Sequence, residues 1–364
     1  MKSKDKIKHI CLARPANSTQ EHADVLAAQA ANFGVKTCFL NLNRNTRFSW
    51  LNWIICRAHI LFRRSSYIFL SSPYLEHQPS WLVRGNFKLA YAGYGLPLSN
   101  WEFGHFSAGL TEKCKILIAG SEYEFLGYHK AQRVSQKILL AGNPLMWQIR
   151  DQIKKESIQK FGVRQILWAP HWSSRWMDSD YGYSRWREKA PVIFEFAKMH
   201  PGIYFVFRPH PLLRASIFET SDKNNKIYQR EIQKSIDAKE DKLEIEILKE
   251  FVKLPNVTLS TGTMSEDILQ SDALITSGVS IFGYWAATGK PMVIYRDRES
   301  PRFGVNGERL ILSSEIVSTT TELLSWMQKT INLAEIEINH NLVKSCEEIF
   351  PTFTKSPMQL ILES

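Results

Sequence analysis

The chain has 364 residues, of which 44% are hydrophobic and 23% are charged, and its formal net charge is +10 at pH 7. This composition is too apolar and too aromatic for a disordered or collagen-like chain, and the length is sufficient for two domains. The positive charge favours an anionic partner such as a phosphate, a nucleotide, a nucleic acid or an acidic membrane surface.

The cysteines and the apolar segments indicate a cytoplasmic protein. Five widely spaced cysteines form neither a disulfide framework nor a zinc motif, and we expect them to be reduced. The basic N-terminus lacks the apolar core of a signal peptide. The longest apolar stretch, Trp50–Phe62, is interrupted by Arg57 and His59 and is shorter than the ~20 residues that a membrane span needs.

Short apolar runs alternate with helical periods in the first part of the chain, which is the pattern of a parallel α/β sheet. We expect strands at 7–12, 35–40, 66–70, 87–92, 115–119 and 137–140 and helices at 19–32 and 50–62. Gly142-Asn143-Pro144 ends this pattern, and the polar segment 150–160 is interpreted as a connecting helix. The first domain is therefore predicted to cover residues 1–143.

A second alternating series predicts a second α/β domain at 144–335, followed by a helical tail at 336–364 that can pack back on the first domain. We expect strands at 165–169, 203–208, 257–259, 273–276 and 291–295 and helices at 186–199, 280–288 and 320–333. The charged segment 221–251 is interpreted as a solvated surface helix. Two similar α/β halves are what a ligand-binding cleft between Rossmann-like domains requires.

The strongest local motif is Phe207-Arg208-Pro209-His210-Pro211, which directly follows an apolar strand. Arg208 and His210 should therefore emerge at the carboxyl end of a parallel strand, where open α/β sheets bind their ligands. An arginine can hold a phosphate through two hydrogen bonds, and an imidazole can donate to a phosphate oxygen or protonate a leaving group. The alternative is a proline-rich strand exit with a capping histidine.

The segment Trp168-Ala169-Pro170-His171-Trp172-Ser173 also ends an apolar strand and supplies a histidine together with the hydroxyls of Ser173 and Ser174. Two strand ends would thus direct similar groups to one edge of the sheet. The alternative is aromatic packing at a domain interface, with His171 there by coincidence.

The third motif, Thr276-Ser277-Gly278-Val279-Ser280, leads from a strand into a helix. Backbone N–H groups at a helix N-terminus, together with the hydroxyls of Ser277 and Ser280, can bind a phosphate. Serine and glycine are also common helix caps, so this motif is weak when taken alone.

In their order and spacing, these three segments resemble the CDP-glycerol glycerophosphotransferase family, which makes teichoic acids and capsules. The likeness covers roughly residues 87–312 and includes Gly142-Asn143-Pro144 as the counterpart of a Gly-x-Pro, Ser271-Asp272 before the third motif, and Gly289-Lys290-Pro291 after it. The resemblance implies a GT-B fold of two Rossmann-like domains with a central cleft, in which the C-terminal domain holds the cytidine nucleotide and the N-terminal domain holds the acceptor.

The chain departs from the family pattern at several positions. The family's Trp-His-Gly-x-Pro corresponds to Gly93-Tyr94-Gly95-Leu96-Pro97, so Tyr94 stands where the family has the histidine proposed as its catalytic base. A tyrosine, with a pKa near ~10, is a poor base at neutral pH. The same loop offers Glu102 and His105 as other candidate bases. A family aspartate is Ser277 here, and an acidic position in the following helix is Gly283. The chain would be a divergent member.

The resemblance implies a transferase that moves glycerol phosphate, or a related polyol phosphate, from a CDP-activated donor to a cell-surface polysaccharide or lipid-linked acceptor. Arg208, His210, Pro170, Ser173, Thr276, Ser277, Gly278 and Ser280 would bind the donor, and His210, His171, Tyr94 and Glu102 are the catalytic candidates. Neither a cofactor nor a metal is required, because Arg, His and a helix dipole can offset the pyrophosphate charge.

Two other functions remain open at this point. One is a GT-B glycosyltransferase that uses a CMP-activated acidic sugar such as Kdo or sialic acid, and the other is a noncatalytic nucleotide-binding GT-B protein. Nucleic acid is not an expected partner, because no RNP, KH or helix-turn-helix pattern is present. The mixture of Trp, Ile and Arg in Trp50–Arg64 suits either a core helix or an interfacial helix. Peripheral association with an anionic inner membrane face is therefore a hypothesis.

Overall fold

The computed structural model of the protein describes residues 9–14, 20–41, 67–71, 87–93, 95–100, 109–131, 136–155, 162–172, 186–218, 241–278, 280–298 and 300–363, together with the single positions 54, 58, 82 and 106. The chain forms two compact units. Unit 1 comprises Met1–Pro97, Trp101–Asp151 and Glu347–Ser364, and unit 2 comprises Leu98–Asn100 and Gln152–Cys346.

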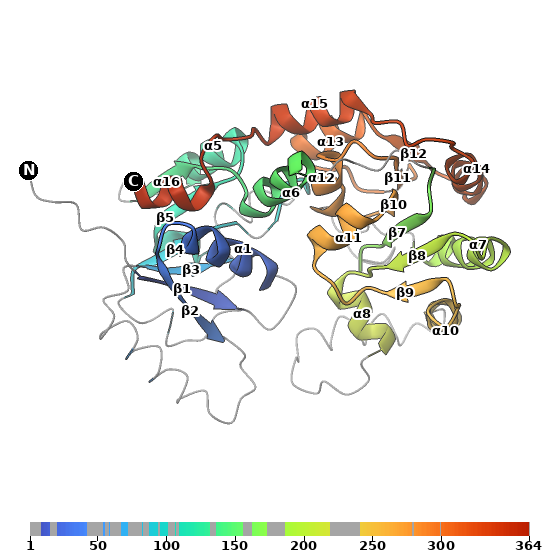
Figure 1. The fold of residues 1–364 in the computed structure, drawn as a ribbon, viewed down its shortest axis with the longest axis horizontal. Coiled ribbons are helices and arrows are strands. Elements are labelled where there is room, and N and C mark those ends of the chain that lie inside the picture. The colour runs from blue at the N-terminus through green and yellow to red at the C-terminus, as the bar shows by residue number, and fades with distance from the viewer. Residues whose placement is uncertain are drawn as a thin grey trace, which may run out of the picture. The chain divides into compact units, whose positions relative to one another are not determined.

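Unit 1 contains a parallel sheet whose described strands have the order β2-β1-β3-β4-β5-β6 (Figure 1). Its elements are β1 (His9–Arg14), α1 (Gln20–Ala31), β2 (Lys36–Asn41), β3 (Tyr67–Leu70), β4 (Leu89–Tyr91), η2 (Thr111–Lys113), β5 (Cys114–Ala119), α5 (Glu122–Ala131), β6 (Lys137–Leu140), most of α6 (Pro144–Lys155) and α16 (Pro357–Glu363). The inner strands β3, β4 and β5 and the Ile10–Leu12 part of β1 are largely buried, as expected in a covered parallel sheet, whereas the edge strands β2 and β6 are more exposed.

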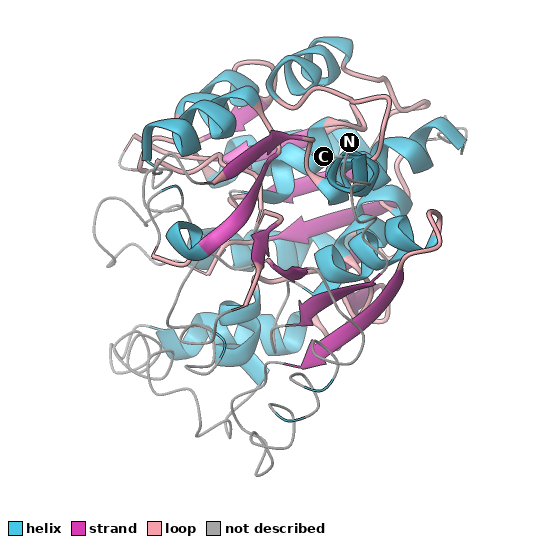
Figure 2. Ribbon diagram, turned by 90° about the vertical axis from the view of Figure 1, so that its left-hand side faces the viewer, coloured by secondary structure: helices cyan, strands magenta, loops and turns pink. Residues whose placement is uncertain are grey.

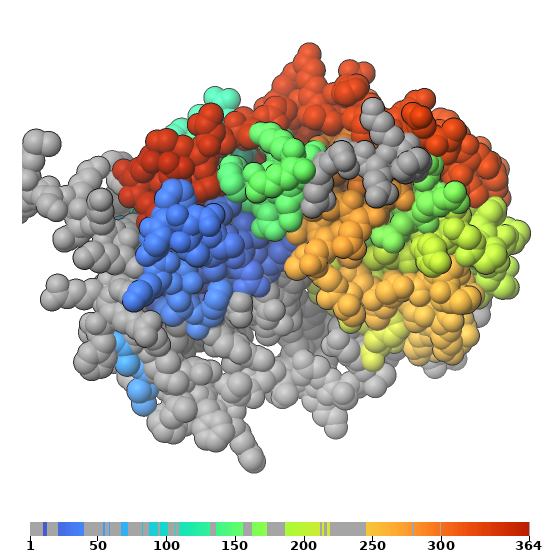
Figure 3. Space-filling model, viewed as in Figure 1, coloured from blue at the N-terminus to red at the C-terminus, as the bar shows by residue number. Residues whose placement is uncertain are grey.

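The C-terminal helix α16 completes the core of unit 1. Met358 and Ile361 are buried together with Ala23 and Leu26 of α1, and the Met358 backbone N–H donates to the Gln29 side chain over 3.3 Å. The space-filling view shows the C-terminal segment lying against α1 (Figure 3). Residues more than 300 positions apart in the chain therefore stabilise one hydrophobic core.

Unit 2 contains a second parallel sheet, with the order β12-β11-β10-β7-β8-β9 among its described strands. Its elements are β7 (Gln165–Ala169), α7 (Trp186–Met199), β8 (Tyr204–Phe207), α8 (Pro211–Phe218), α10 (Asp241–Phe251), β9 (Val257–Leu259), α11 (Met264–Gln270), β10 (Ala273–Thr276), α12 (Ser280–Ala286), β11 (Met292–Tyr295), α13 (Val305–Ile311), β12 (Glu315–Val317), α14 (Thr320–Ile331) and most of α15 (His340–Ile349). This is the 3-2-1-4-5-6 order of a doubly wound fold.

Helices pack against the strands of unit 2, with α11 on β7, α12 on β10 and α14 on β11 and β12. Figure 2 shows the helices and strands of the chain coloured by type. Helix α10 was expected to be a solvated surface helix, and that expectation is wrong for its last turns. Leu248 and Phe251 are fully buried, and the Phe251 ring lies 5.1 Å from the Trp168 ring of β7. Glu246 and Glu250 are exposed while Leu248 and Phe251 extend the core, so the polar composition of the segment obscured an amphipathic helix.

Most expected elements form within one or two residues of their predicted bounds. β7, α7, β9 and β10 have the predicted bounds, whereas the expected helix at 50–62 lies outside the described residues apart from positions 54 and 58. The expected domain boundary after residue 143 precedes α6, which stays with unit 1 as far as Asp151. Residues 347–364 also belong to unit 1.

Candidate functional site

The strand order of unit 2 reverses direction between β7 and β10, and this topological switch point is where doubly wound sheets bind ligands. β7 pairs with β10 from Ala273↔Ile166 to Thr276↔Ala169, so both strands end at the same level. The residues that follow these two strands are Pro170-His171 and Ser277-Gly278. Two of the three sequence motifs therefore meet at one point of the sheet edge.

The first motif joins this edge from β8, the neighbour of β7 on the other side. The backbone N–H of Arg208 donates to the Trp168 carbonyl over 2.9 Å, and the N–H of His210 donates to the Pro170 carbonyl over 3.1 Å. Parallel pairing thus continues for several residues beyond the strands. It places His210 beside His171.

The imidazole rings of His171 and His210 lie 5.2 Å apart between centroids. The Trp172 ring is close to both, at 5.7 Å from His171 and 6.2 Å from His210. All three side chains are partly buried. The result is a compact aromatic group with ring nitrogens at the carboxyl edge of the sheet.

Burial determines the protonation state of this histidine pair. It lowers the pKa of His171 from 6.5 to about 3. Burial, together with the neighbouring His171, lowers the pKa of His210 well below its ordinary value. Both rings are therefore neutral at physiological pH, and each carries one N–H donor and one acceptor nitrogen. A neutral imidazole can accept a proton from a hydroxyl, and its N–H can donate to a phosphate oxygen.

The turn after β10 is held tightly against the end of β7. The Thr276 hydroxyl donates to the Ala169 carbonyl over 2.7 Å and accepts from the Gly278 backbone N–H over 2.8 Å. The Ser277 hydroxyl accepts from the backbone N–H of His171 over 3.3 Å. These hydroxyls therefore bond within the protein and shape the turn. Ser280 begins α12 immediately afterwards.

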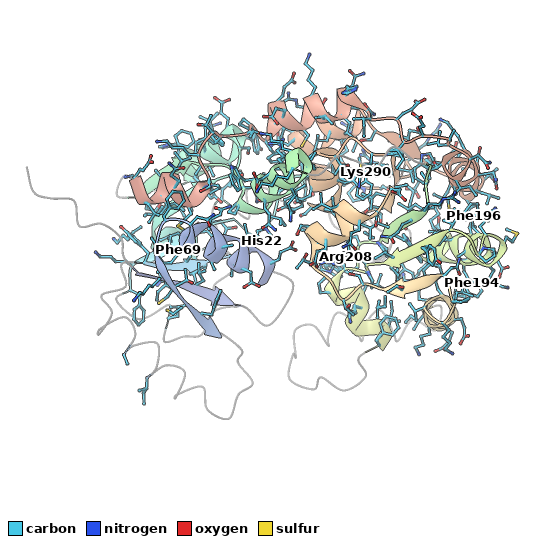
Figure 4. The ribbon with its side chains drawn as sticks, in the orientation of Figure 1. His22, Phe69, Phe194, Phe196, Arg208 and Lys290 are labelled. Carbon is cyan, nitrogen blue, oxygen red and sulfur yellow. The ribbon has the colours of Figure 1, made fainter. Side chains whose placement is uncertain are left out.

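The side chain of Arg208, predicted to bind phosphate, bonds to protein groups through Nη1. This nitrogen lies 2.6 Å from a carboxylate oxygen of Asp267, and it donates to the Ser260 hydroxyl over 2.9 Å and to the Gly262 carbonyl over 3.0 Å. Arg208 thus connects the end of β8 to α11 (Figure 4). Its predicted contact with a donor phosphate stays a prediction.

Two further parts of the family resemblance have structural contacts. The Asp272 carboxylate accepts from the backbone N–H groups of Arg164 and Gln165 over 2.9 and 2.8 Å, at the amino end of β7. The Lys290 ammonium donates to the carbonyls of Leu269 and Ser271, each over 2.7 Å, at the C-terminal end of α11. Both side chains act away from the carboxyl edge of the sheet.

The remaining candidates lie outside the described residues, namely Tyr94, Glu102, His105, Ser173 and Ser174. The structure therefore brings together Pro170, His171, His210, Thr276, Ser277 and Gly278 in unit 2. Sequence reasoning had not assigned Trp172, Ser260 or Asp267 to the site. A capping box at Thr263 and Glu266 was a readable signal for α11, but the contact of its Asp267 with Arg208 spans 59 residues.

Metal ions and membrane spans were also sought within the part of the chain that the structure describes. There, no group of three or more His, Cys, Asp or Glu residues is arranged to hold a metal ion. In the same residues, no helix has both the length and the apolar character to cross a bilayer.

Comparison with known proteins shows the fold. No family model and no curated protein matches the chain. Among solved structures, the wall teichoic acid polymerase TagF aligns over 98% of this chain and 88% of its own, with a TM-score of 0.57 and 13% identity. A Listeria monocytogenes protein assigned as a UDP-N-acetylglucosamine 2-epimerase aligns over 98% and 95%, with a TM-score of 0.56 and 8% identity. The chain therefore has the two-domain α/β fold of the GT-B type that its motifs led us to expect.

Proposed function

We propose that this protein is a transferase that binds a cytidine-activated donor at the carboxyl edge of the unit 2 sheet. The donor is CDP-glycerol or a related CDP-polyol, and the acceptor is a cell-surface polysaccharide or a lipid-linked molecule. The observation that carries the proposal is the pair of neutral histidines, 5.2 Å apart, at the topological switch point.

The chemistry proposed for this site is phosphoryl transfer. An acceptor hydroxyl attacks the β-phosphorus of the donor, the bond from this phosphorus to the bridging oxygen breaks, and CMP leaves with that oxygen. The N–H of the His210 imidazole donates to a phosphate oxygen, and His171 takes the acceptor proton. Burial lowers the pKa of His171 to about 3 in the ligand-free protein, so this role requires the negative charge of the bound donor phosphates to raise that pKa. The Tyr94 loop, including Glu102, is the second candidate for that proton.

The fold and the motif resemblance support this choice of donor. The solved structures of similar fold include TagF, a wall teichoic acid polymerase, and a histidine-to-asparagine variant of TagF soaked with CDPG. The resemblance in the sequence covers the three segments that meet at the unit 2 site. No cofactor is part of the proposed reaction.

Binding of cytidine compounds tests the proposal. A ligand at 100 times its Kd stabilises the folded state by ~2.7 kcal/mol, which raises the Tm of a unit of this size by ~5–10 °C. We expect that shift with CDP-glycerol or CDP-ribitol, and little or no shift with UDP-sugars. A shift confined to CMP-Kdo or CMP-sialic acid would instead favour a glycosyltransferase that uses a CMP-activated acidic sugar. No shift with any cytidine compound would refute the proposal.

Variants of the histidine pair locate the binding site. His210→Ala should weaken CDP binding and abolish release of CMP, while His340→Ala, which changes an exposed histidine at the start of α15, should leave both unchanged. Full activity of His210→Ala would contradict the assignment. CDP binding without turnover in the unaltered protein would favour the noncatalytic alternative.

We also propose that the protein works at the inner face of the cell membrane, held by its positive charge. Vesicles containing anionic lipid should sediment with the protein at low salt and release it at high salt. Failure to sediment at low salt would refute this association without affecting the transferase proposal.

A further inference from the structure

The arginine of the Arg-Pro-His-Pro motif belongs to a group of four side chains that we call the Ser260 clamp, consisting of Arg208, Arg214, Ser260 and Asp267. Arg208 bonds to the Ser260 hydroxyl over 2.9 Å and to the Asp267 carboxylate over 2.6 Å. Arg214 bonds to the Ser260 carbonyl over 2.8 Å. The Ser260 hydroxyl also donates to the same Asp267 oxygen, which closes the network.

The clamp holds the segment that carries His210 on both sides. Arg208 precedes His210 by two residues, and Arg214 follows it by four. Both arginines bond to Ser260, at the end of β9, and the Ser260 backbone N–H in turn donates to the Phe207 carbonyl at the end of β8 over 2.8 Å. The position of His210 at the sheet edge is therefore coupled to the turn between β9 and α11.

Helix α11 gives Asp267 a rigid position. The Thr263 hydroxyl accepts from the Glu266 backbone N–H, and the Glu266 carboxylate accepts from the Thr263 N–H over 2.7 Å, so the first turn is capped in both directions. Lys290 binds the carbonyls at the other end of the helix. A short helix that is tied at both ends can fix the carboxylate that holds Arg208.

The environment of the ion pair makes it a stable connection. The Asp267 and Arg208 side chains are 10% and 24% exposed, so water screens their attraction only partly. The charges are also supported by the Ser260 hydroxyl and the Gly262 carbonyl. Nη1 of Arg208 therefore bonds to protein groups, whereas the motif alone had suggested that it contacts a phosphate.

We propose that Asp267 is a positioning residue of the donor site, which acts through Arg208 to hold His210 against the end of β7. The identity of the ligand rests on the proposed function, whereas the mechanical connection rests on the clamp alone. Because a misplacement of ~1 Å at a reacting group can cost ~100-fold in rate, loss of this connection should be measurable at His210.

The test combines a neutral variant, a charge-preserving variant and a double variant. We expect Asp267→Asn to weaken CDP binding ~10-fold and Asp267→Glu to restore it to within ~3-fold, with Kd measured by calorimetry. In a His210→Ala background the Asp267→Asn change should add less than ~2-fold, because residues that act through one another are non-additive. If Asp267→Asn does not fold, Ser260→Ala replaces it in the same cycle.

Asp272→Asn is the matched control. Asp272 is also a hydrogen-bonded carboxylate of unit 2, but its partners lie at the amino end of β7. Its substitution should lower the Tm and leave the Kd for CDP unchanged. An equal loss of affinity in the two Asn variants would show that Asp267 matters only for stability, and it would overturn the proposal.

Two other results would also overturn it. Tighter CDP binding by Asp267→Asn would mean that the carboxylate holds Arg208 back from the phosphates. Additive effects of Asp267→Asn and His210→Ala would mean that the two residues act separately.

The ligand-free protein gives an independent measurement, through the imidazole Cε1–H resonance of His210 in the NMR spectrum. This resonance should move in Asp267→Asn and stay in place in Asp272→Asn. If the unaltered protein does not bind CDP, the proposed function fails, and the resonance alone decides on the clamp. An unmoved resonance in Asp267→Asn would refute the positioning role.

Discussion

Lys290 gives a test of whether the Lys-Pro part of the motif pattern serves stability or chemistry. Its ammonium is buried and donates to the carbonyls of Ile268, Leu269 and Ser271 over 3.3, 2.7 and 2.7 Å. It also lies 5.7 Å from the centre of the Trp285 ring. Lys290→Met keeps the apolar stem of the side chain and removes only the charged donor.

The expected loss of stability follows from these contacts. A hydrogen bond from a charged group contributes ~1.5–3 kcal/mol, and Lys290 makes two short ones and one longer one. The summed contribution of these hydrogen bonds is partly offset, because water solvates the ammonium in the unfolded chain and this solvation is lost on folding. We therefore expect unfolding of unit 2 to become easier by ~3–5 kcal/mol, which lowers the Tm by ~10 °C at ~2–4 °C per kcal/mol for a unit of this size.

Differential scanning calorimetry measures this loss, and calorimetric titration with CDP at a temperature where the variant is folded measures the site. Lys329→Met is the control, since the Lys329 side chain is 70% exposed and its pairing with Glu315 is solvated. Its Tm should change by less than ~1 °C. A stable Lys290→Met variant that has lost affinity for CDP would refute the reasoning, because Lys290 would then belong to the donor site.

Three further predictions follow from buried groups. Burial lowers the pKa of His22 to about 4 and that of His171 to about 3, so the folded state excludes a proton that the unfolded chain binds below pH 6.5. The free energy of unfolding is therefore highest above pH 6.5 and falls as the pH approaches the folded pKa, by ~2 kcal/mol per histidine between pH 7.5 and 5. Urea midpoints that do not change between these two pH values would contradict this prediction. Gly127→Ala would place a Cβ 2.4 Å from the Phe106 ring, and it should cost ~1–2 kcal/mol in urea unfolding although alanine favours helix. Asn256→Ala removes a buried amide that donates to three backbone carbonyls, so a Tm lowered by less than ~2 °C would contradict an expected loss of ~2–3 kcal/mol.

The strands were the part of the fold most readable from the sequence. β7 and β10 are continuous apolar runs bounded by polar residues, which is the pattern of a strand covered on both faces. The three motifs that follow strands were expected at the carboxyl edge of a sheet, and the strand pairing brings all three to one edge. Parallel topology explains this success, since it puts all strand ends on the same side.

Long-range side-chain contacts could not be predicted in the same way. The sequence places Arg208 at a strand end, but its Asp267 partner lies in a short helix 59 residues later, and many other carboxylates were available. The burial of Phe251 at the end of a charged segment was hidden for a related reason, because one buried turn contributes little to the composition of a long polar stretch. The inclusion of α16 in unit 1 likewise depends on a contact between distant parts of the chain.

The motif pattern divides into two kinds of residue once its contacts are known. Asp272 and Lys290 form hydrogen bonds with backbone groups of β7 and α11. A GT-B domain without transferase activity would need these bonds for its stability to the same extent. Keeping the His171 and His210 imidazoles neutral and partly buried instead makes the folded state sensitive to acid. A role of the pair in binding or catalysis accounts for an arrangement that makes the folded state sensitive to acid. The pair, more than the length of the resemblance, is therefore the argument for an active transferase, and CMP release by the unaltered protein but not by His210→Ala is the result that would establish it.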